Sequence, residues 1–251
     1  IDIVGKIINT NLKILGKENF KNVNLNFNYN NKNLEIINLK LKYKNTIFVS
    51  ENITANLKNN SLSLKGDFKN KIYQNLISTF LNYDVKNYLN DKFLLSSKSN
   101  FEINFNKKLK VKNYKLKSKI STDDININLK NINLKNYITD FDNKIILQNG
   151  ELDLIINSQN DTKVKIKSKY ILNKEHNPKD FLLNFSKQNS IEKYEVSIDL
   201  FENELNFNEI NFNKKTDEEM FLNLIATKNK DTYKIINFKL FNKKNIFNFK
   251  N

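Results

Sequence analysis

Apolar and polar residues alternate along most of the chain. Residues 23–29 read Val-Asn-Leu-Asn-Phe-Asn-Tyr, and residues 125–129 read Ile-Asn-Ile-Asn-Leu, with a repeat of the pattern at Ile132 and Leu134. Successive side chains of a β-strand point to opposite faces of its sheet. A period of two therefore predicts strands that have one apolar and one polar face.

Short polar segments separate these stretches. Residues 30–33 (Asn-Asn-Lys-Asn) predict a turn, because asparagine tolerates the left-handed backbone conformation that glycine usually supplies. The doublet Ile36-Ile37 breaks the alternation and predicts a bulge or a change of register. In total the pattern indicates roughly fifteen strands of about five residues. The sequence therefore predicts an all-β fold, a long twisted antiparallel sheet with short connections.

Residues 70–92 depart from the alternation. Ile72, Leu76, Phe80 and Leu81 are spaced as on one side of a helix, so the segment predicts a short helical insertion. Such an insertion could act as a lid or a membrane-facing element, or it could simply close one end of the sheet. Residues 1–19 carry a short apolar pattern that fits either a strand or the end of a helix.

The composition is that of a folded chain. Of the 251 residues, 39% are hydrophobic and 12% aromatic, which is enough to build an apolar core. With only 4 Gly and 1 Pro, no linker divides the chain, so residues 1–251 are expected to form a single β-rich unit. Because the chain starts at Ile1 and ends within a strand-like pattern, we expect it to be a segment of a longer protein.

The net charge of +15 admits two interpretations. A basic chain can bind nucleic acid or an anionic membrane, or its lysines can simply coat the solvent-facing side of a sheet. All 42 basic residues are lysine, whereas proteins that read nucleic acid sequences rely on the bidentate contacts of arginine. We therefore expect no nucleic acid partner and favour the solvent-facing interpretation.

Residue patterns that carry catalytic chemistry are absent from the sequence. There is no Cys and a single His, His176, so neither thiol chemistry nor a zinc site is expected. The adjacent carboxylates Asp123-Asp124 and Glu218-Glu219 would point to opposite faces of a strand and so could not act as an acid and base pair. We expect a non-enzymatic protein with no catalytic residues, no metal and no cofactor.

The apolar face itself is the most informative feature. Patches of this size rarely stay exposed on a monomer, because every buried apolar side chain stabilises the fold by about 1.5–3 kcal/mol. Three arrangements would cover it. The sheet could close on itself as a sandwich or barrel, it could bind another protein, or it could curl into a groove that holds lipid acyl chains.

Several segments resemble the AsmA-like family of bridge-like bacterial lipid transport proteins, which includes TamB and YhdP. The similar segments are residues 57–70, where a strand contains Gly-x-Phe, the helix-like residues 76–93, the strand-like residues 97–105, and residues 120–137. The resemblance implies a periplasmic body, anchored to the inner membrane by a segment outside this chain. It also implies an apolar groove along which phospholipid moves toward the outer membrane, with the two membranes or proteins in them as partners.

The resulting hypothesis is a lipid carrier segment whose groove holds phospholipid acyl chains. The main alternative is a structural or adhesin-like β-sandwich or solenoid with a closed core, and a second is an electrostatic binder that acts through its lysines. The residues expected to line the groove are Val23, Leu25, Phe27, Leu39, Leu41, Leu62, Leu64, Phe101, Ile103, Ile125, Ile127, Leu129, Leu152 and Leu154.

Overall fold

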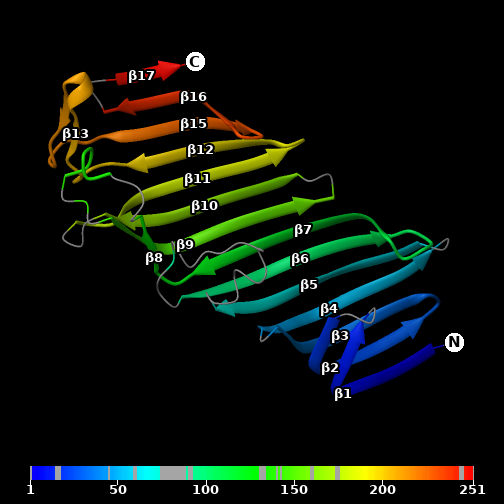
Figure 1. The fold of residues 1–251 in the computed structure, drawn as a ribbon. Coiled ribbons are helices and arrows are strands. Elements are labelled where there is room, and N and C mark those ends of the chain that lie inside the picture. The colour runs from blue at the N-terminus through cyan, green and yellow to red at the C-terminus, as the bar shows by residue number, and fades with distance from the viewer. Residues whose placement is uncertain are drawn as a thin grey trace.

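Almost all of the chain forms antiparallel β-strands (Figure 1). The computed structural model describes residues 2–14, 18–44, 46–58, 61–73, 89, 93–129, 134–139, 141, 143–158, 161–172, 176–242 and 246–250. The elements are β1 (Asp2–Ile14), β2 (Glu18–Asn30), β3 (Asn33–Tyr43), β4 (Thr46–Lys58), β5 (Ser61–Tyr73), β6 (Leu94–Phe105), β7 (Val111–Thr122), β8 (Ile125–Asn128), β9 (Lys144–Asn157), β10 (Thr162–Ile171), β11 (Lys179–Gln188), β12 (Ile191–Asp199), β13 (Leu205–Phe207), the 3-10 helix η1 (Asn208–Ile210), β14 (Phe212–Lys214), β15 (Phe221–Asn229), β16 (Thr232–Phe241) and β17 (Ile246–Lys250).

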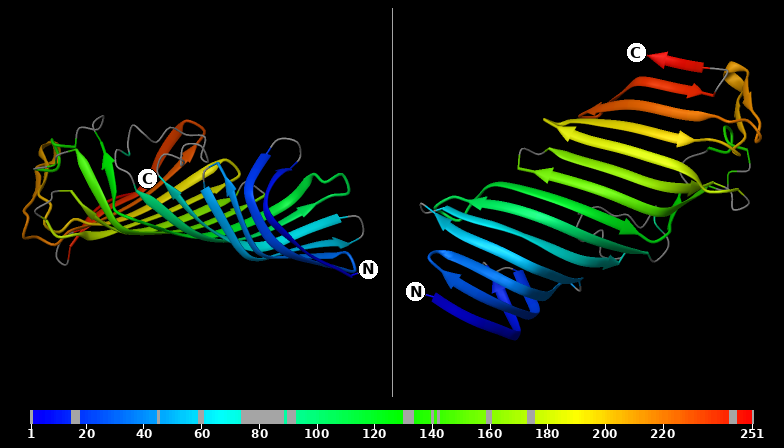
Figure 2. Two further views of the ribbon diagram at one scale, coloured as in Figure 1. Left: turned by 90° about the horizontal axis from the view of Figure 1, so that it is seen from below. Right: turned by 180° about the vertical axis from the view of Figure 1, so that it is seen from behind.

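These strands form one 15-stranded sheet that follows chain order, so the predicted all-β antiparallel sheet is confirmed. Consecutive strands pair as a meander from β1 to β17, with β8 attached beside β9 and the β13–β14 hairpin forming a separate small sheet. The chain begins at one edge of the sheet and ends at the other (Figure 1). Viewed from below, the main sheet is a single twisted and curved layer (Figure 2).

Most strands of the main sheet have 9 to 14 residues and so are about twice as long as predicted, or longer. Ile47-Val49 and Ile53-Leu57, which suggest two strands in the sequence, belong to the single strand β4 of 13 residues. The break between them is a shift in the register of β4 with β5, between Val49 and Ile53. A bulge interrupts the alternation without ending the strand, so the sequence pattern underestimates strand length.

Asparagine makes the turns and bulges. Asn31 and Lys32 both have positive φ angles, 46° and 68°, which is the backbone of a two-residue hairpin turn and confirms the turn predicted over 30–33. Asn38, with φ 55°, lies beside the irregular β2–β3 pairing and confirms the bulge predicted after Ile36-Ile37. Asn149 on β9 has φ 52° in the same way. Left-handed conformations are open to asparagine more readily than to other residues with a side chain.

Asparagine side chains also repair the hydrogen bonding that these bulges disturb. The register of β1 with β2 is irregular between Ile7 and Leu12. There the backbone N–H of Asn9 donates to Asn24 Oδ1 at 3.0 Å, and the backbone N–H of Asn22 donates to Asn11 Oδ1 at 3.3 Å. Strands can therefore bend while their polar groups stay paired.

Two parts of the sequence prediction need correction. The segment expected to be helical from residue 70 begins as strand, because residues 70–73 complete β5 and pair with β6 in unbroken register. Residues 74–88 and 90–92 lie outside the described part of the chain, and Leu89 forms an isolated bridge with Ile127. Leu134 does not extend the pattern of β8 but starts a turn, since its carbonyl accepts from the N–H groups of Tyr137 and Ile138.

Two small clusters of buried residues lie at one end of the sheet. In one, Leu205 and Met220 pack with Leu200 and Leu240, and in the other Phe141 packs with Tyr170 and Leu172. The first cluster places the β13–β14 region against β12, β15 and β16, and the second places Leu134, Ile138 and Phe141 against β9 to β12. Within the described part of the chain, no helix has the length and hydrophobicity needed to cross a membrane.

A buried lysine secures the β13–β14 hairpin. Lys214 ends β14 and is fully buried, and this burial lowers the pKa of its amine. Its Nζ donates to the carbonyl oxygens of Asn203 at 2.9 Å and Lys215 at 2.8 Å. Asn203 in turn donates to the Tyr170 hydroxyl of β10 at 3.2 Å, so this polar network ties the hairpin to the main sheet.

Lys214→Ala is expected to destabilise the protein by about 2–4 kcal/mol, because it leaves a cavity and two carbonyl groups without their donor. Urea denaturation followed by circular dichroism measures this change. The exposed neighbour provides the control, since Lys215→Ala should stay within about 0.5 kcal/mol of the parent protein. Equal unfolding free energies for the two variants would contradict a clamping role for Lys214.

A second polar contact predicts how stability depends on pH. Glu202 accepts hydrogen bonds from the side chain and backbone of Asn177 and from Lys179, and these contacts lower the pKa of its carboxyl to about 2. The folded pKa lies below the ordinary value, so this stabilisation is present above about pH 4.5 and is lost as the pH falls toward 2. Glu202→Gln should therefore flatten the loss of stability across that interval, as measured by denaturation at each pH. An unchanged slope would show that Glu202 does not contribute to it.

Candidate functional site

Cross-strand register collects the apolar side chains on one face of the sheet. Residues that pair across neighbouring strands lie on the same face, so each row of partners shows what the face contains. One such row runs through Ala55, Leu64, Ile103 and Tyr114, on β4 to β7. Rows on the same side of the sheet as this one continue across the strands from β1 to β17. We call the surface that they form the apolar face.

All residues that the sequence predicts for the groove lie on or against this face. Phe101 pairs with Gly66 and Leu116, Leu154 pairs with Val164, and Ile125 pairs with Leu147. The predicted residues on the main path of the sheet, all in apolar rows, are Val23, Leu25, Phe27, Leu39, Leu41, Leu62, Leu64, Phe101, Ile103, Leu152 and Leu154. Ile125 and Ile127 extend the face on β8, and Leu129 packs against the cluster of Phe141 and Tyr170.

Most of the apolar face is only half-buried. Val23 and Leu25 are buried, with exposed fractions of 1% and 9%, whereas Leu64, Phe101 and Leu154 are intermediate. Within the described residues, the two clusters cover the face only at one end of β9 to β16. The wide remainder of the face, above all on β5 to β7, keeps apolar surface in reach of solvent.

Aromatic side chains missing from the sequence prediction contribute to this surface. Phe68 lies between Phe48 and Phe101, with ring centroids 5.8 Å and 6.1 Å apart. Phe48 and Phe68 sit next to positions where the alternation breaks, near the register shift of β4 and the glycine of β5. A signal was available in the sequence, since Phe68, Asn70 and Ile72 alternate with lysines and an aspartate.

Small polar residues cross the middle of the apolar face. Ser99 and Ser118 are buried partners on β6 and β7, and their hydroxyl groups are 2.7 Å apart. Beside them, Ser97 Oγ donates to Asn70 Oδ1. The hydrogen bond within each pair gives these polar groups a partner on the apolar face.

Charged groups mark the rim of the face at the ends of β11 and β12. Lys187 and Glu192 are cross-strand partners and lie on the same side of the sheet as the apolar residues. Lys187 Nζ is 3.1 Å from Glu192 Oε1. Hydrogen bonds from Tyr194 and Lys187 lower the pKa of Glu192, while burial and the hydrogen bond to Glu192 raise the pKa of Tyr194 to about 12. The face thus changes from apolar to charged at this strand end.

In the part of the chain that the structure describes, the carboxylates and the histidine singled out in the sequence lie in separate places. His176 lies in the segment before β11, and Asp123-Asp124 lie between β7 and β8, where Asp124 accepts from Gln148 at 3.1 Å. Glu218 and Glu219 are exposed in the turn before β15. Among the described residues, no group of three His, Cys, Asp or Glu side chains could hold a metal ion.

The close approach of β4 and β5 at Gly66 predicts a difference in stability between two variants. Gly66→Val should destabilise the protein by about 1–3 kcal/mol, because a Cβ at this position would meet the backbone oxygen of Asn52 at 2.8 Å. Thermal unfolding of the variant measures this effect. Lys65→Val, a change on the opposite face, is the control, and equal losses for both variants would contradict the close approach of β4 and β5.

No family model matches this chain, and no curated protein and no solved structure matches it. The function proposed below therefore rests on the chemistry of the chain's own surfaces, above all on the broad, half-exposed apolar face.

Proposed function

We propose that this chain is part of a non-enzymatic lipid carrier, and that its apolar face forms a groove that holds the acyl chains of phospholipids. The observation that carries the proposal is the continuity of that face. Apolar rows follow one another from β1 to β17, and the described residues cover them only toward one end of the sheet. A surface of this extent requires an apolar partner.

Acyl chains match the chemistry of the face. Each CH₂ group that leaves water contributes about 0.8 kcal/mol, and contact with side chains such as Leu64 and Phe101 requires no specific geometry. A chain that leaves a bilayer for this face exchanges one apolar surrounding for another. Movement along successive rows then replaces each contact with an equivalent one, so no bond has to form or break.

The charged rim suits the other end of a phospholipid. Lys187, Glu192 and Tyr194 provide polar groups where the apolar rows end. A phospholipid whose acyl chains lie on the face could keep its head group at such a rim, in contact with water. This arrangement avoids the cost of burying a charged head group, which amounts to several kcal/mol.

The wider setting of the proposal rests on the resemblance to AsmA-like proteins. On that basis the chain acts in the periplasm, as part of a longer protein that a segment outside this chain anchors to the inner membrane. Phospholipid then moves toward the outer membrane, and the partners are the two membranes or proteins within them. Acyl chains are the ligand, and neither a cofactor nor nucleic acid takes part.

Photo-crosslinking tests the apolar face directly. Benzoylphenylalanine replaces Phe101, which points to the apolar face, or its neighbour Asn100, which points to the opposite face. After incubation with phospholipid vesicles and irradiation, mass spectrometry should find lipid adducts at position 101 and not at position 100. Folded protein without adducts at position 101 would refute the lipid-carrier proposal and favour a structural role.

A charge on the apolar face should block lipid transfer. Leu64→Glu places a carboxylate in the row of Ala55 and Ile103, where it must lose its hydration whenever an acyl chain passes. The rate of phospholipid transfer between donor and acceptor vesicles should fall by about tenfold or more. Lys65→Glu carries the same new side chain on the opposite face and should transfer lipid at the parental rate, whereas equal losses in the two variants would place transport elsewhere.

A further inference from the structure

The polar face of the sheet, opposite the apolar face, is organised by charge pairing. Lys115 lies opposite Glu102, and Glu102 lies opposite Lys65, so charges of opposite sign alternate across β5, β6 and β7. On β9 and β10, Glu151 lies opposite Lys167 in the same manner. Opposite charges in direct cross-strand positions stabilise a sheet, and like charges destabilise it.

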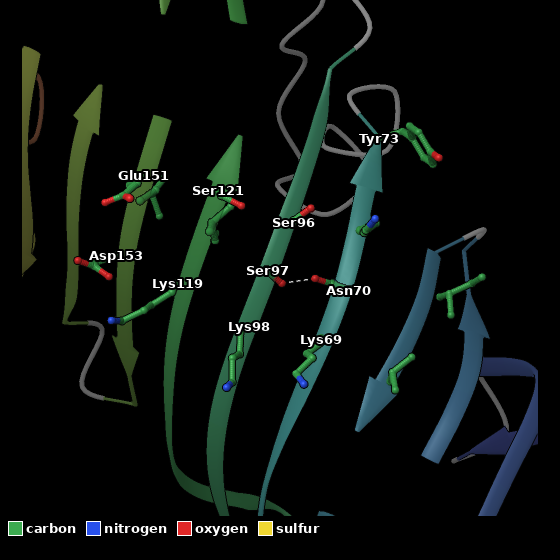
Figure 3. Close-up of a pocket in the computed structure, with 15 residues that line it drawn as sticks. Lys69, Asn70, Tyr73, Ser96, Ser97, Lys98, Lys119, Ser121, Glu151 and Asp153 are labelled. Atoms are coloured by element: carbon green, nitrogen blue, oxygen red, sulfur yellow. Dashed lines mark hydrogen bonds between the residues drawn. The ribbon is translucent and has the colours of Figure 1, made fainter. Parts of the chain in front are cut away.

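A row across β5, β6 and β7 departs from this rule. Lys69, Lys98 and Lys119 are direct cross-strand partners there. In Figure 3 the side chains of Lys69 and Lys98 lie side by side, and that of Lys119 extends toward Asp153. Lys69 forms an ion pair with Glu51 at 2.5 Å. Within the described part of the chain, Lys98 and Lys119 have no ion pair, although Asp153 on β9 is the next residue in the row. Neighbouring strands are about 4.8 Å apart, so the three lysines concentrate positive charge at one place on the polar face.

A depression of about 880 Å³ lies over this row (Figure 3). Its lining includes Lys69, Lys98 and Lys119 together with the adjacent pair Ser96 and Ser121. The residues between these positions point their side chains to the opposite face, so the backbone of the sheet forms the floor of the depression. Two hydroxyl groups and three lysine side chains therefore line one concave surface.

The side of the depression formed by β4 and the end of β5 is apolar. Ile47, Val49 and Tyr73 line it and are 50%, 39% and 60% exposed. The opposite side carries Glu151 and Asp153, which repel an anion. A ligand with a negative group and an apolar body would therefore place its charge over β6 and β7 and its body toward β4.

We propose that this depression binds a phosphate group carried by an amphipathic molecule. A phosphate monoester has a charge of about −1.5 to −2 and three acceptor oxygens, so it can neutralise both Lys98 and Lys119 and accept from Ser96 and Ser121. A carboxylate would neutralise only one of the lysines. A nucleic acid would require an extended track of unpaired lysines, whereas acidic partners flank this row.

Titration with short-chain lipids tests the site. Dihexanoyl phosphatidic acid carries the phosphate monoester, while dihexanoyl phosphatidylcholine supplies the same chains without that charge. Calorimetry should show that Lys98→Gln with Lys119→Gln weakens phosphatidic acid binding by at least about tenfold and leaves phosphatidylcholine binding unchanged. The control, Lys115→Gln with Lys163→Gln, removes the same charge from the same face and should change the affinity by less than about twofold.

A second pair of variants leaves the net charge unchanged. Ser96→Ala with Ser121→Ala should weaken phosphatidic acid binding by about fivefold, the loss expected for about 1 kcal/mol of hydrogen bonding. Lys98→Gln with Lys119→Gln should cause the same loss when it is combined with Leu64→Glu, which blocks the apolar face, so the site can be tested apart from the proposed lipid carrier function. Thermal unfolding should show that the lysine variants are at least as stable as the parent protein, because a repulsion has been removed.

The source of the ligand is distinguished with vesicles. Flotation of the parent protein, but not of the Lys98→Gln with Lys119→Gln variant, on vesicles that contain phosphatidic acid supports a membrane phospholipid. Binding of soluble phosphatidic acid without flotation supports a soluble phosphorylated amphiphile. The proposal is overturned if both lysine pairs lose affinity equally, if inorganic phosphate binds as tightly as phosphatidic acid, or if a single-stranded oligonucleotide binds more tightly than either.

Discussion

Cross-strand register is the constraint on which the whole structure depends. A slip of one residue in any strand would move its apolar side chains to the opposite face, because successive side chains alternate. Each bulge adds a residue that would move the following side chains to the wrong face, and asparagine residues at the bulges keep them on the right one. At Asn38 the left-handed backbone absorbs one residue, so that Ile36 and Leu39 both remain in rows of the apolar face. The curved sheet thus bends without mixing its two surfaces.

Separation of the two surfaces gives each a different chemistry. Apolar contacts have no preferred direction, and the proposal that acyl chains move along the apolar face rests on this property. The polar face holds fixed charges in register, so an imbalance such as Lys98 opposite Lys119 marks a particular place. A single layer can carry both because each strand contributes alternate side chains to the two sides. A sandwich would have hidden one of these surfaces inside its core.

Tertiary contacts decide where the apolar face is open. At the end near β13 and β14, Phe141, Leu205 and Met220 cover it with a small conventional core. Lys214 and Glu202 hold the covering loops in place through hydrogen bonds rather than through apolar area. The face over β5 to β7 has no comparable cover among the described residues, and its side chains keep intermediate exposure.

The sequence alone determined the all-β class, the hairpin order and most of the residues of the apolar face, because alternation is a local property of neighbouring positions. Residues such as Leu64 and Ile103 could be assigned to one face from their own strands. Only the tertiary structure decided that β4 is one long strand, that Phe48 joins the face, and that Lys214 is buried. It also placed Lys69, Lys98 and Lys119 in one row. These features depend on register between strands, and the register is set by long-range pairing that no local pattern contains.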